Sequence, residues 1–258
     1  MSKRRIDHLL VERGCAESRQ KAQALLIAGQ VLVNDQKVEK PGHLVAPESA
    51  IRVIGTLPFA SRGGVKLQAA LDWFQISVAG RLCADLGAST GGFTDCLLQA
   101  GARSVYAFDV GKGQLAWKLR SDPRVVVRDQ FNVRNITAQD LPLQISLVTV
   151  DLSFISLDKI LPPLSQALSL RSGEWKDRPA PFHVDLVLLV KPQFEVGKGE
   201  VGKGGIVRSA EKRMRAVTRV ESTAAAQGYE VVGKIPSPIS GAKGNEEFLL
   251  YLRWVPAL

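Results

Sequence analysis

The sequence predicts an α/β protein whose large domain is built on a mostly parallel, seven-stranded, doubly wound sheet and follows a small α+β domain. From residue 82 onward, short apolar runs alternate with helical patterns, which is typical of parallel strands joined by crossover helices. The first 54 residues form shorter elements, and Gly55 and Pro58 lie in the linker that follows. We therefore expect a small domain at 1–54, a linker at 55–60 and a large domain at 61–258.

Composition limits the possible functions. The 258 residues are 45% hydrophobic and 23% charged, and the net charge of +9 suggests a polyanionic partner such as nucleic acid, although it could serve solubility alone. Cys15, Cys83 and Cys96 are far apart and the three histidines are scattered, so we expect neither disulfides nor a metal site. The apolar run at 186–190 is too short to span a bilayer, and the charged N-terminus lacks a signal-peptide core. We expect a cytoplasmic protein that does not enter membranes.

Two short helices and a small hairpin are predicted in the small domain. Gly14 ends the first helix, Ser18 can cap the second, and Gly29 ends it. Arg19 and Lys21 lie in the first turn of the second helix, where cations are unfavourable unless an anion is near. This position favours nucleic-acid binding over the alternative that the domain only docks on its neighbour.

The large domain begins with a helix that reaches Phe74 and has Lys66 in its first turn. Strands are predicted at 82–86, 104–108, 125–127, 146–150, 185–190, 229–235 and 247–252. Further helices are predicted at 94–100, 112–120, 155–169 and 209–227, and a surface loop at 171–183. Ser209 can cap the last helix, which Gly228 ends.

The segment 82–93 has the pattern of a strand, a glycine turn and the start of a helix. Gly87, Gly91 and Gly92 let the backbone approach a ligand, and the helix N-terminus offers free N–H groups. The glycine spacing is Gly-x-x-x-Gly-Gly, so the dinucleotide fingerprint Gly-x-Gly-x-x-Gly is not met. Asp109 ends the next strand, at the sequence distance where an acidic residue often meets a ribose.

Charged side chains follow five successive strands: Asp85, Asp109, Asp129, Asp151 and Lys191. The carboxyl ends of such strands meet at one edge of the sheet, where ligands bind. The connection at 236–246 is too short for a helical crossover, so the last strand is expected to be antiparallel. Its start then brings Glu246 and Glu247 to the same edge.

The first 54 residues resemble the S4 RNA-binding domain. The matching residues are Arg5, Asp7, Ser18, Arg19, Ala22, Gly29, Val31, Val33, Asn34, Lys40 and Pro41. That family usually has glycine where this chain has Asp35. The resemblance implies that RNA is a partner, and the candidate RNA-binding residues of this region are Arg4, Arg5, Arg19 and Lys21.

Five motifs of the large domain resemble the TlyA family of S4–FtsJ-like rRNA 2′-O-ribose methyltransferases, often labelled haemolysin A. They are SRGGVKL at 61–67, DLGASTGGF at 85–93, DLSFIS at 151–156, KPQFE at 191–195 and GNEEF at 244–248. The resemblance implies a Rossmann-like class I methyltransferase fold, S-adenosylmethionine as cofactor and a cytidine ribose 2′-hydroxyl of rRNA, free or in ribosomal subunits, as the target.

The resemblance also implies site residues. The catalytic set is Lys66, Asp151, Lys191 and Glu247, with Glu246 as an ambiguous neighbour of Glu247. Candidate cofactor-binding residues are Gly91, Phe93, Asp109, Asp129 and Asp151 from the FtsJ resemblance, and Asp85, Gly87, Ser89 and Gly92 from the pattern of the glycine loop; FtsJ itself has tryptophan where this chain has Phe93. Clustered cations beside the site give further candidate RNA-binding residues, namely Arg62, Lys198, Lys203, Lys212 and Arg215.

A ribose 2′-hydroxyl is a poor nucleophile, so a base must take its proton during methyl transfer. Our hypothesis is that Lys191 is this base or orients the hydroxyl. Lys66 would hold the ribose or its phosphate, and Asp151 and Glu247 would position the two ammonium groups. The alternative is a structural ion-pair network.

Other functions are weighed against this hypothesis. Gly197 begins a partial P-loop pattern, but Gly204 occupies the position of the magnesium-binding serine or threonine, so nucleotide hydrolysis is rejected. Base C5 methylation needs a cysteine nucleophile, and no cysteine follows a predicted strand end. A non-catalytic ribosome-assembly factor and a membrane-active haemolysin stay open as alternatives.

Overall fold

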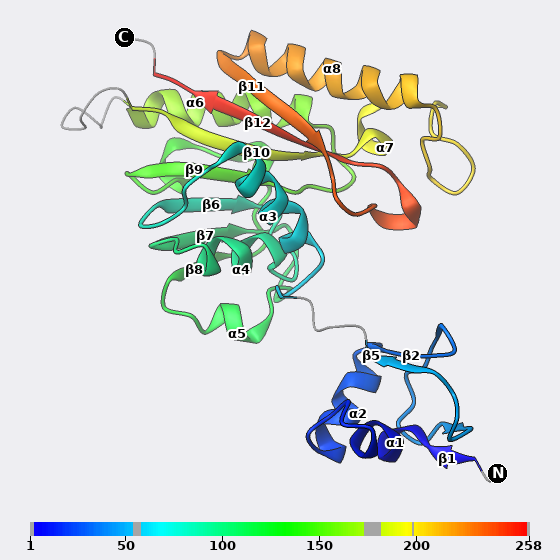
Figure 1. The fold of residues 1–258 in the computed structure, drawn as a ribbon. Coiled ribbons are helices and arrows are strands. Elements are labelled where there is room, and N and C mark those ends of the chain that lie inside the picture. Colours follow the sequence, from blue (N-terminus) through cyan, green and yellow to red (C-terminus); the bar gives the residue numbers. More distant parts are fainter. Residues whose placement is uncertain (1–2, 54–57, 173–181, 198, 257–258) are drawn as a thin grey trace. The chain divides into compact units, whose positions relative to one another are not determined.

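The computed structural model describes residues 3–53, 58–172, 182–197 and 199–256. The chain divides into two compact units, Met1–Leu57 and Pro58–Leu258 (Figure 1).

The first unit holds the two predicted helices, α1 (Ile6–Glu12) and α2 (Arg19–Ile27), packed on short antiparallel strands. The Ser18 side chain accepts a hydrogen bond from the Lys21 N–H and so caps α2. The strands are β1 (Arg4–Arg5), β2 (Val31–Val33), β3 (Gln36–Lys37), β4 (Leu44–Val45) and β5 (Ile51–Val53), paired as β1-β4 and as β3-β2-β5. Asn34 and Asp35, both with positive φ, form the two-residue turn between β2 and β3.

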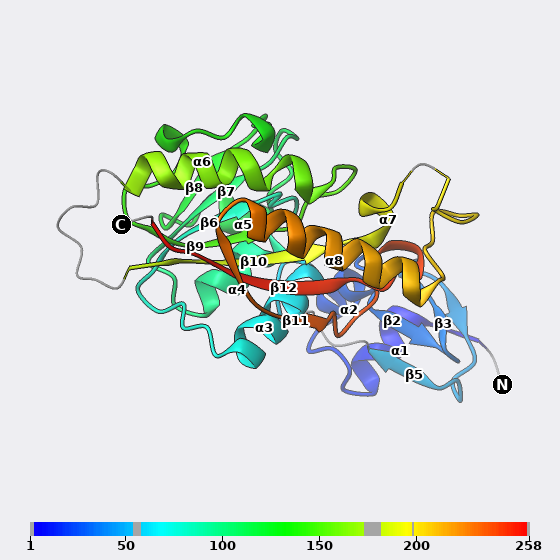
Figure 2. The ribbon, with the colours of Figure 1, turned by 90° about the horizontal axis from the view of Figure 1, so that it is seen from above.

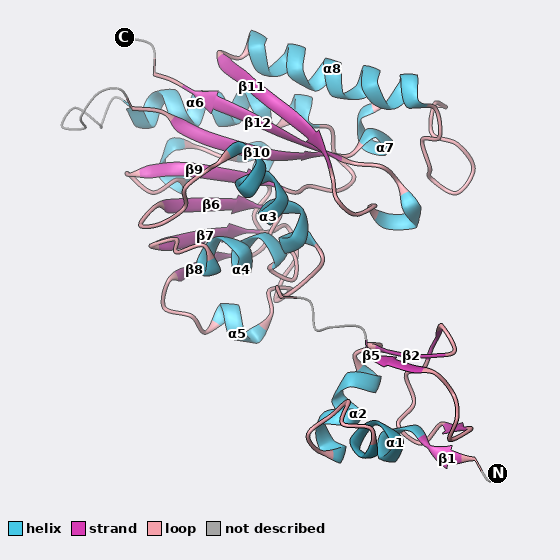
Figure 3. Ribbon diagram, viewed as in Figure 1, coloured by secondary structure: helices cyan, strands magenta, loops and turns pink. Residues whose placement is uncertain are grey.

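The second unit contains the predicted seven-stranded sheet, in the order β11-β12-β10-β9-β6-β7-β8 (Figure 3). The strands are β6 (Leu82–Leu86), β7 (Ser104–Phe108), β8 (Val125–Arg128), β9 (Ile145–Val150), β10 (Val184–Val190), β11 (Tyr229–Pro236) and β12 (Phe248–Trp254). β12 is antiparallel to both of its neighbours, β10 and β11, and the other pairs are parallel. The antiparallel last strand is therefore confirmed.

Helices cover both faces of this sheet (Figure 2). One core contains side chains of α6 (Leu161–Ser172) and α8 (Ala210–Ala226), and the other contains side chains of α3 (Gly63–Phe74), α4 (Gly92–Gln99) and α5 (Trp117–Arg120). Residues of β10 alternate between the two cores, and all seven are buried. The sheet is thus rigidly held where β10 delivers Lys191 to its edge.

Two helix predictions need correction. The predicted helix at 112–120 is wrong over its first half, because Gly113 has a φ of +68° and only α5 is helical. The prediction at 155–169 corresponds to two pieces, a 3-10 turn η3 (Leu157–Lys159) and then α6, which extends to Ser172. Most of the predicted loop at 171–183 lies outside the described residues.

A short helix α7 (Pro192–Glu195) follows β10, and three further 3-10 turns are η1 (Val133–Asn135), η2 (Ala138–Asp140) and η4 (Ala242–Gly244). Within the part of the chain that the structure describes, no helix has the length and apolar character needed to cross a membrane.

Candidate active site

The glycine loop between β6 and α4 has backbone angles that ordinary side chains rarely adopt. Gly87 has a φ of +94°, and a Cβ there would lie 2.4 Å from the Asp151 carbonyl oxygen. Gly91, with a φ of +98°, is the N-cap of α4, and a Cβ there would meet Leu119 at 2.2 Å. The two glycines therefore allow the loop to pack against the start of the 151–157 loop and against α5.

Asp85 lies beneath this loop instead of lining a cavity. Its side chain is completely buried and accepts hydrogen bonds from the hydroxyls of Thr94 (2.7 Å) and Thr149 (3.0 Å). Burial without a cationic partner raises the pKa of this carboxyl to about 7. Asp85 thus links β6 to α4 and β9, and its expected contact with the cofactor stays a prediction.

The two acidic residues after β7 and β8 hold loop backbone. Asp109 accepts hydrogen bonds from the N–H groups of Ser89 (2.8 Å) and Gly111 (2.7 Å) and lines the larger of two cavities. Asp129 accepts from the Gly113 N–H at 3.1 Å, and the Arg120 guanidinium lowers the pKa of its carboxyl. Asp129 lines neither of the cavities described next.

Two adjoining cavities open at the carboxyl edge of the parallel strands. The smaller has a volume of about 280 Å³ and the larger of about 960 Å³. Gly87, Ser89, Asp151 and Ser153 line both, so the glycine loop and the start of the 151–157 loop form their common wall. Gly92 and Phe93 line the smaller cavity, whereas Gly91 lines neither.

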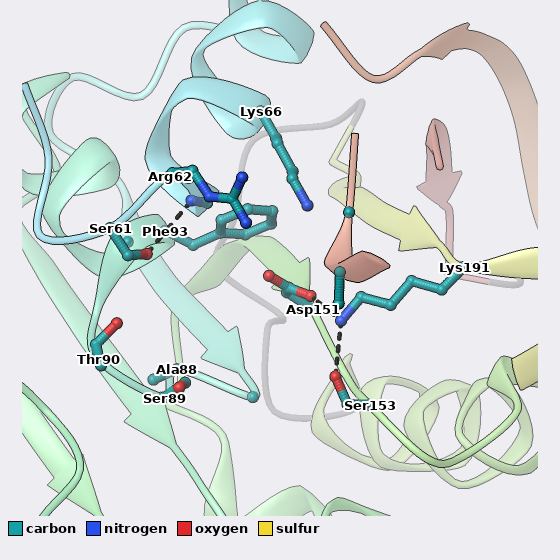
Figure 4. A pocket seen from close by; sticks show the side chains of 15 residues that line it. Ser61, Arg62, Lys66, Ala88, Ser89, Thr90, Phe93, Asp151, Ser153 and Lys191 are labelled. Atoms are coloured by element: carbon teal, nitrogen blue, oxygen red, sulfur yellow. Dashed lines mark hydrogen bonds and ion pairs between the residues drawn. The ribbon is translucent and has the colours of Figure 1, made fainter. Parts of the chain in front are cut away.

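Lys191 and Asp151 meet at this common wall (Figure 4). The Lys191 Nζ lies 2.7 Å from Asp151 Oδ1, at an angle outside that of a hydrogen bond, and donates a hydrogen bond to Ser153 Oγ at 2.9 Å. Only 11% of the Lys191 side chain is exposed to solvent. The Lys191 amine is thus held in the smaller cavity by one carboxylate and one hydroxyl that line both cavities.

Lys66 enters the smaller cavity from α3, and Figure 4 shows its amine pointing into the same space as that of Lys191. It pairs with Glu247 Oε2 at 2.5 Å, and both side chains are nearly buried. Gly241 permits this arrangement, because a Cβ there would lie 1.8 Å from Glu247 Oε1. The neighbouring Glu246 is 62% exposed and pairs with Arg213 instead, so the geometry selects Glu247.

Several site residues had no role in our prediction. Ser153 is one, and Glu195 is another: it is buried and accepts hydrogen bonds from the Ser156 hydroxyl (2.6 Å) and the Leu157 N–H (3.0 Å). This contact ties the loop after β9 to the turn after β10, and burial raises the pKa of Glu195. Ser153 and Glu195 belong to the motifs at 151–156 and 191–195, but the contact of Glu195 with Ser156, 39 positions away, has no local signal.

The cavities also have an aromatic rim. Phe154 is 90% exposed with a φ of +64°, and its ring lies 5.1 Å from that of Phe194. Both rings line the larger cavity, together with the apolar side chains of Val110, Phe131 and Val133.

The candidate RNA-binding cations of the large domain lie in different surroundings. Arg62 lines the smaller cavity and Lys203 is exposed on the loop before α8. Lys212 and Arg215 are both ion-paired with Glu200. Lys198 lies outside the described residues.

The candidate RNA-binding cations of the small domain include two that share a partner. Arg5 and Arg19 both bind Asp7, whereas Arg4 pairs with Glu12 and Lys21 is exposed.

Comparison with known proteins agrees with this geometry. The FtsJ-like methyltransferase model matches residues 59–254. The chain belongs to the FtsJ-like methyltransferase family. It is a methyltransferase, its methyl donor is S-adenosylmethionine, and an S4 domain model matches residues 4–51.

Two curated relatives match nearly the whole chain. A 16S/23S rRNA (cytidine-2′-O)-methyltransferase TlyA of Mycobacterium tuberculosis is 47% identical and covers 96% of this chain and 89% of its own. A protein named Hemolysin A from Brachyspira hyodysenteriae is 42% identical and covers 96% of this chain and 98% of its own.

Solved structures give the same fold. One from Streptococcus thermophilus, whose name contains the word hemolysin, is 40% identical with a TM-score of 0.71 and covers 99% of this chain and 90% of its own. An S-adenosylmethionine dependent methyltransferase from Mesorhizobium loti is 15% identical with a TM-score of 0.50, covers 72% of this chain and 96% of its own, and so shares the fold alone.

Proposed function

We propose that this protein transfers a methyl group to the ribose 2′-hydroxyl of a cytidine in rRNA, and that Lys191 acts on that hydroxyl. The main support is the pair of nearly buried lysines, Lys66 and Lys191, which point into one cavity beside the glycine loop. The M. tuberculosis relative is named for this reaction on 16S and 23S rRNA. Such a substrate would place the reaction in the cytoplasm.

The residues around the larger cavity fit S-adenosylmethionine. Two small residues of the glycine loop, Gly87 and Ser89, line this cavity. The Asp109 carboxylate can accept hydrogen bonds from ribose hydroxyls, and Val110, Phe131 and Val133 offer an apolar wall for an adenine. The cofactor supplies an electrophilic methyl group on a sulfonium.

Lys191 would position the 2′-hydroxyl and, as the neutral amine, would take its proton and become an ammonium while the oxygen bonds to the methyl carbon and the carbon–sulfur bond breaks. Asp151 and Ser153 fix the direction of the Lys191 side chain, so that little rotational freedom is lost when the ribose arrives. Lys66 is held by Glu247 and would contact the ribose or the neighbouring phosphate. Because these groups are shielded from water, their charges act on the reacting atoms with little screening.

Product analysis tests the proposal. Ribosomal subunits that lack the modification are incubated with S-adenosylmethionine and the wild-type protein or Lys191→Ala, and their nucleosides are analysed by mass spectrometry. We expect 2′-O-methylcytidine with the wild type and a loss of about 10²–10⁴-fold in Lys191→Ala. Cofactor affinity, measured by calorimetry, should stay near wild type.

Two results would contradict the proposal. A base-methylated nucleoside would reject ribose methylation, and near-normal turnover by Lys191→Ala would reject the role of this lysine. A wild-type protein that binds rRNA but not S-adenosylmethionine would instead favour a non-catalytic assembly factor.

A further inference from the structure

Asp7 is a completely buried carboxylate in the small domain, and cations from two elements converge on it. It lies in the first turn of α1 with 0% of its side chain exposed. Arg5 donates to both of its oxygens, from Nε to Oδ1 at 3.0 Å and from Nη2 to Oδ2 at 2.9 Å. From α2, Arg19 Nε and Gln23 Nε2 donate to Oδ2 at 3.0 and 3.1 Å.

The two arginines remain exposed on their outer sides. The exposed fractions of the Arg5 and Arg19 side chains are 44% and 53%. Among the described residues, no hydrogen bond uses Arg5 Nη1 or either terminal nitrogen of Arg19. Each guanidinium is therefore held by its inner edge and has N–H donors left toward solvent.

This arrangement differs from an ordinary surface ion pair. In the same domain, Arg52 pairs with Asp35, but these side chains are 68% and 86% exposed and nothing fixes them. A buried carboxylate is costly unless it is paired, and a buried apolar side chain usually stabilises a core as well or better. The burial of a carboxylate at Asp7 is explained if its partners have a task that needs fixed guanidinium groups.

We propose that Asp7 is a positioning residue that holds Arg5 and Arg19 as a two-guanidinium site for backbone phosphate of the RNA substrate. A guanidinium presents paired N–H donors that match phosphate oxygens. A side chain that is already ordered loses less entropy on binding. The two arginines outweigh the single carboxylate, so the site keeps a positive charge.

The inference rests on the proposed RNA substrate, and its test measures RNA affinity separately from the methylated product. The full-length protein is titrated against unmethylated ribosomal subunits by filter binding over a series of salt concentrations. Asp7→Asn should raise the Kd on the order of tenfold, because two side chains must then be ordered during binding. Asp35→Asn, which removes an exposed carboxylate of the same domain, is the matched control and should leave the Kd near wild type.

A double-mutant cycle separates positioning from general damage. In a variant that carries Arg5→Ala and Arg19→Ala, the salt dependence should weaken by about one counterion for each phosphate that the protein no longer binds. In that background, Asp7→Asn should change the Kd no further. An equal rise in Kd in both backgrounds, or an unchanged Kd when Asp7→Asn is made alone, would overturn the proposal.

If Asp7→Asn does not fold, as judged by its thermal transition, two other variants test whether RNA binding needs the positioned guanidinium groups. Arg5→Lys and Arg19→Lys keep the charge but lose the forked donor geometry. Affinities as weak as those of the alanine variants would support the positioned fork, and wild-type affinities would overturn it. A base-methylated product with this binding pattern intact would reject the proposed reaction while leaving the phosphate site standing.

Discussion

The small domain and the catalytic edge of the large domain both use charged pairs with buried members, but they expose their cations to different extents. Around Asp7 the carboxylate is buried and the arginines are about half exposed. At the sheet edge the lysines themselves are nearly buried, with Lys66 and Lys191 only 10% and 11% exposed. The first arrangement presents cations to a large anion, whereas the second keeps cations for a small group that enters a cavity.

The comparison teaches that burial alone does not set the behaviour of a carboxylate. Asp7 and Asp85 are both 0% exposed, but Asp7 faces guanidinium groups and Asp85 faces only hydroxyls. The pKa of Asp7 is lowered, chiefly by its hydrogen bonds to Arg5, and that of Asp85 is raised to about 7 by desolvation. The partner therefore decides which carboxylate stays charged.

Gly87→Ala should have the largest effect on activity, and it should act on the large domain alone. The new methyl group would lie 2.4 Å from the Asp151 carbonyl oxygen at a φ that alanine rarely adopts. We expect no measurable cofactor binding by calorimetry and no methyl transfer. Gly14→Ala has a similar φ of +68° with nothing within 4 Å and is the control for strain alone. Wild-type cofactor affinity in Gly87→Ala would contradict the tight packing of this loop.

Glu247→Gln should lower the rate of methyl transfer by about 10²-fold, because Lys66 would lose the charge that holds it. Breaking this nearly buried pair should also destabilise the fold by about 3–5 kcal/mol. Denaturant unfolding and single-turnover kinetics measure the two effects. Glu246→Gln, at the exposed neighbour, should change neither, and equal effects in the two variants would reject the assignment of Glu247.

Asp85→Asn should have the smallest effect, which is a change in how the free energy of unfolding depends on pH. It tests the contrast between Asp85 and Asp7. Because the folded pKa of Asp85 lies near 7 and an unfolded aspartate titrates near 4, its contribution to stability falls as the pH rises between these values. The loss should be about 2 kcal/mol from pH 5 to pH 7. Asp7 has the opposite sign: its contribution is present above pH 4 and is lost as the pH falls.

Unfolding curves at several pH values test this difference. Asp85→Asn should remove the pH 5 to 7 component and leave the acid-side loss in place. An unchanged pH dependence in Asp85→Asn would show that another group is responsible.

The sequence predicted the strands well because each is an apolar run, and all seven were located within about two residues. It also predicted which edge of the sheet would collect charges, because parallel strands end together. It did not predict the division of these charges into a Lys66–Glu247 pair and a Lys191–Asp151 pair, since such contacts join residues far apart in the chain. It also did not predict that Arg19, from the next helix, joins Arg5 on Asp7.

One failure has a local cause. The helix predicted at 112–120 is wrong over its first half because apolar spacing outweighed Gly113 in the prediction. The cofactor contacts expected of Asp85 and Asp129 stay predictions. In this structure Asp85 binds the hydroxyls of Thr94 and Thr149, and Asp129 binds Arg120 and the Gly113 N–H.

The most direct test of the central claim compares Lys191→Ala with Asp7→Asn in single-turnover methylation of unmethylated ribosomal subunits over a range of subunit concentrations. We expect the two substitutions to change different kinetic constants. Lys191→Ala should lower the rate constant at saturating subunits with little change in half-saturation, and Asp7→Asn should raise half-saturation with a near wild-type limiting rate. If both variants lower the same constant, the separation between a catalytic site and a phosphate-binding site is wrong.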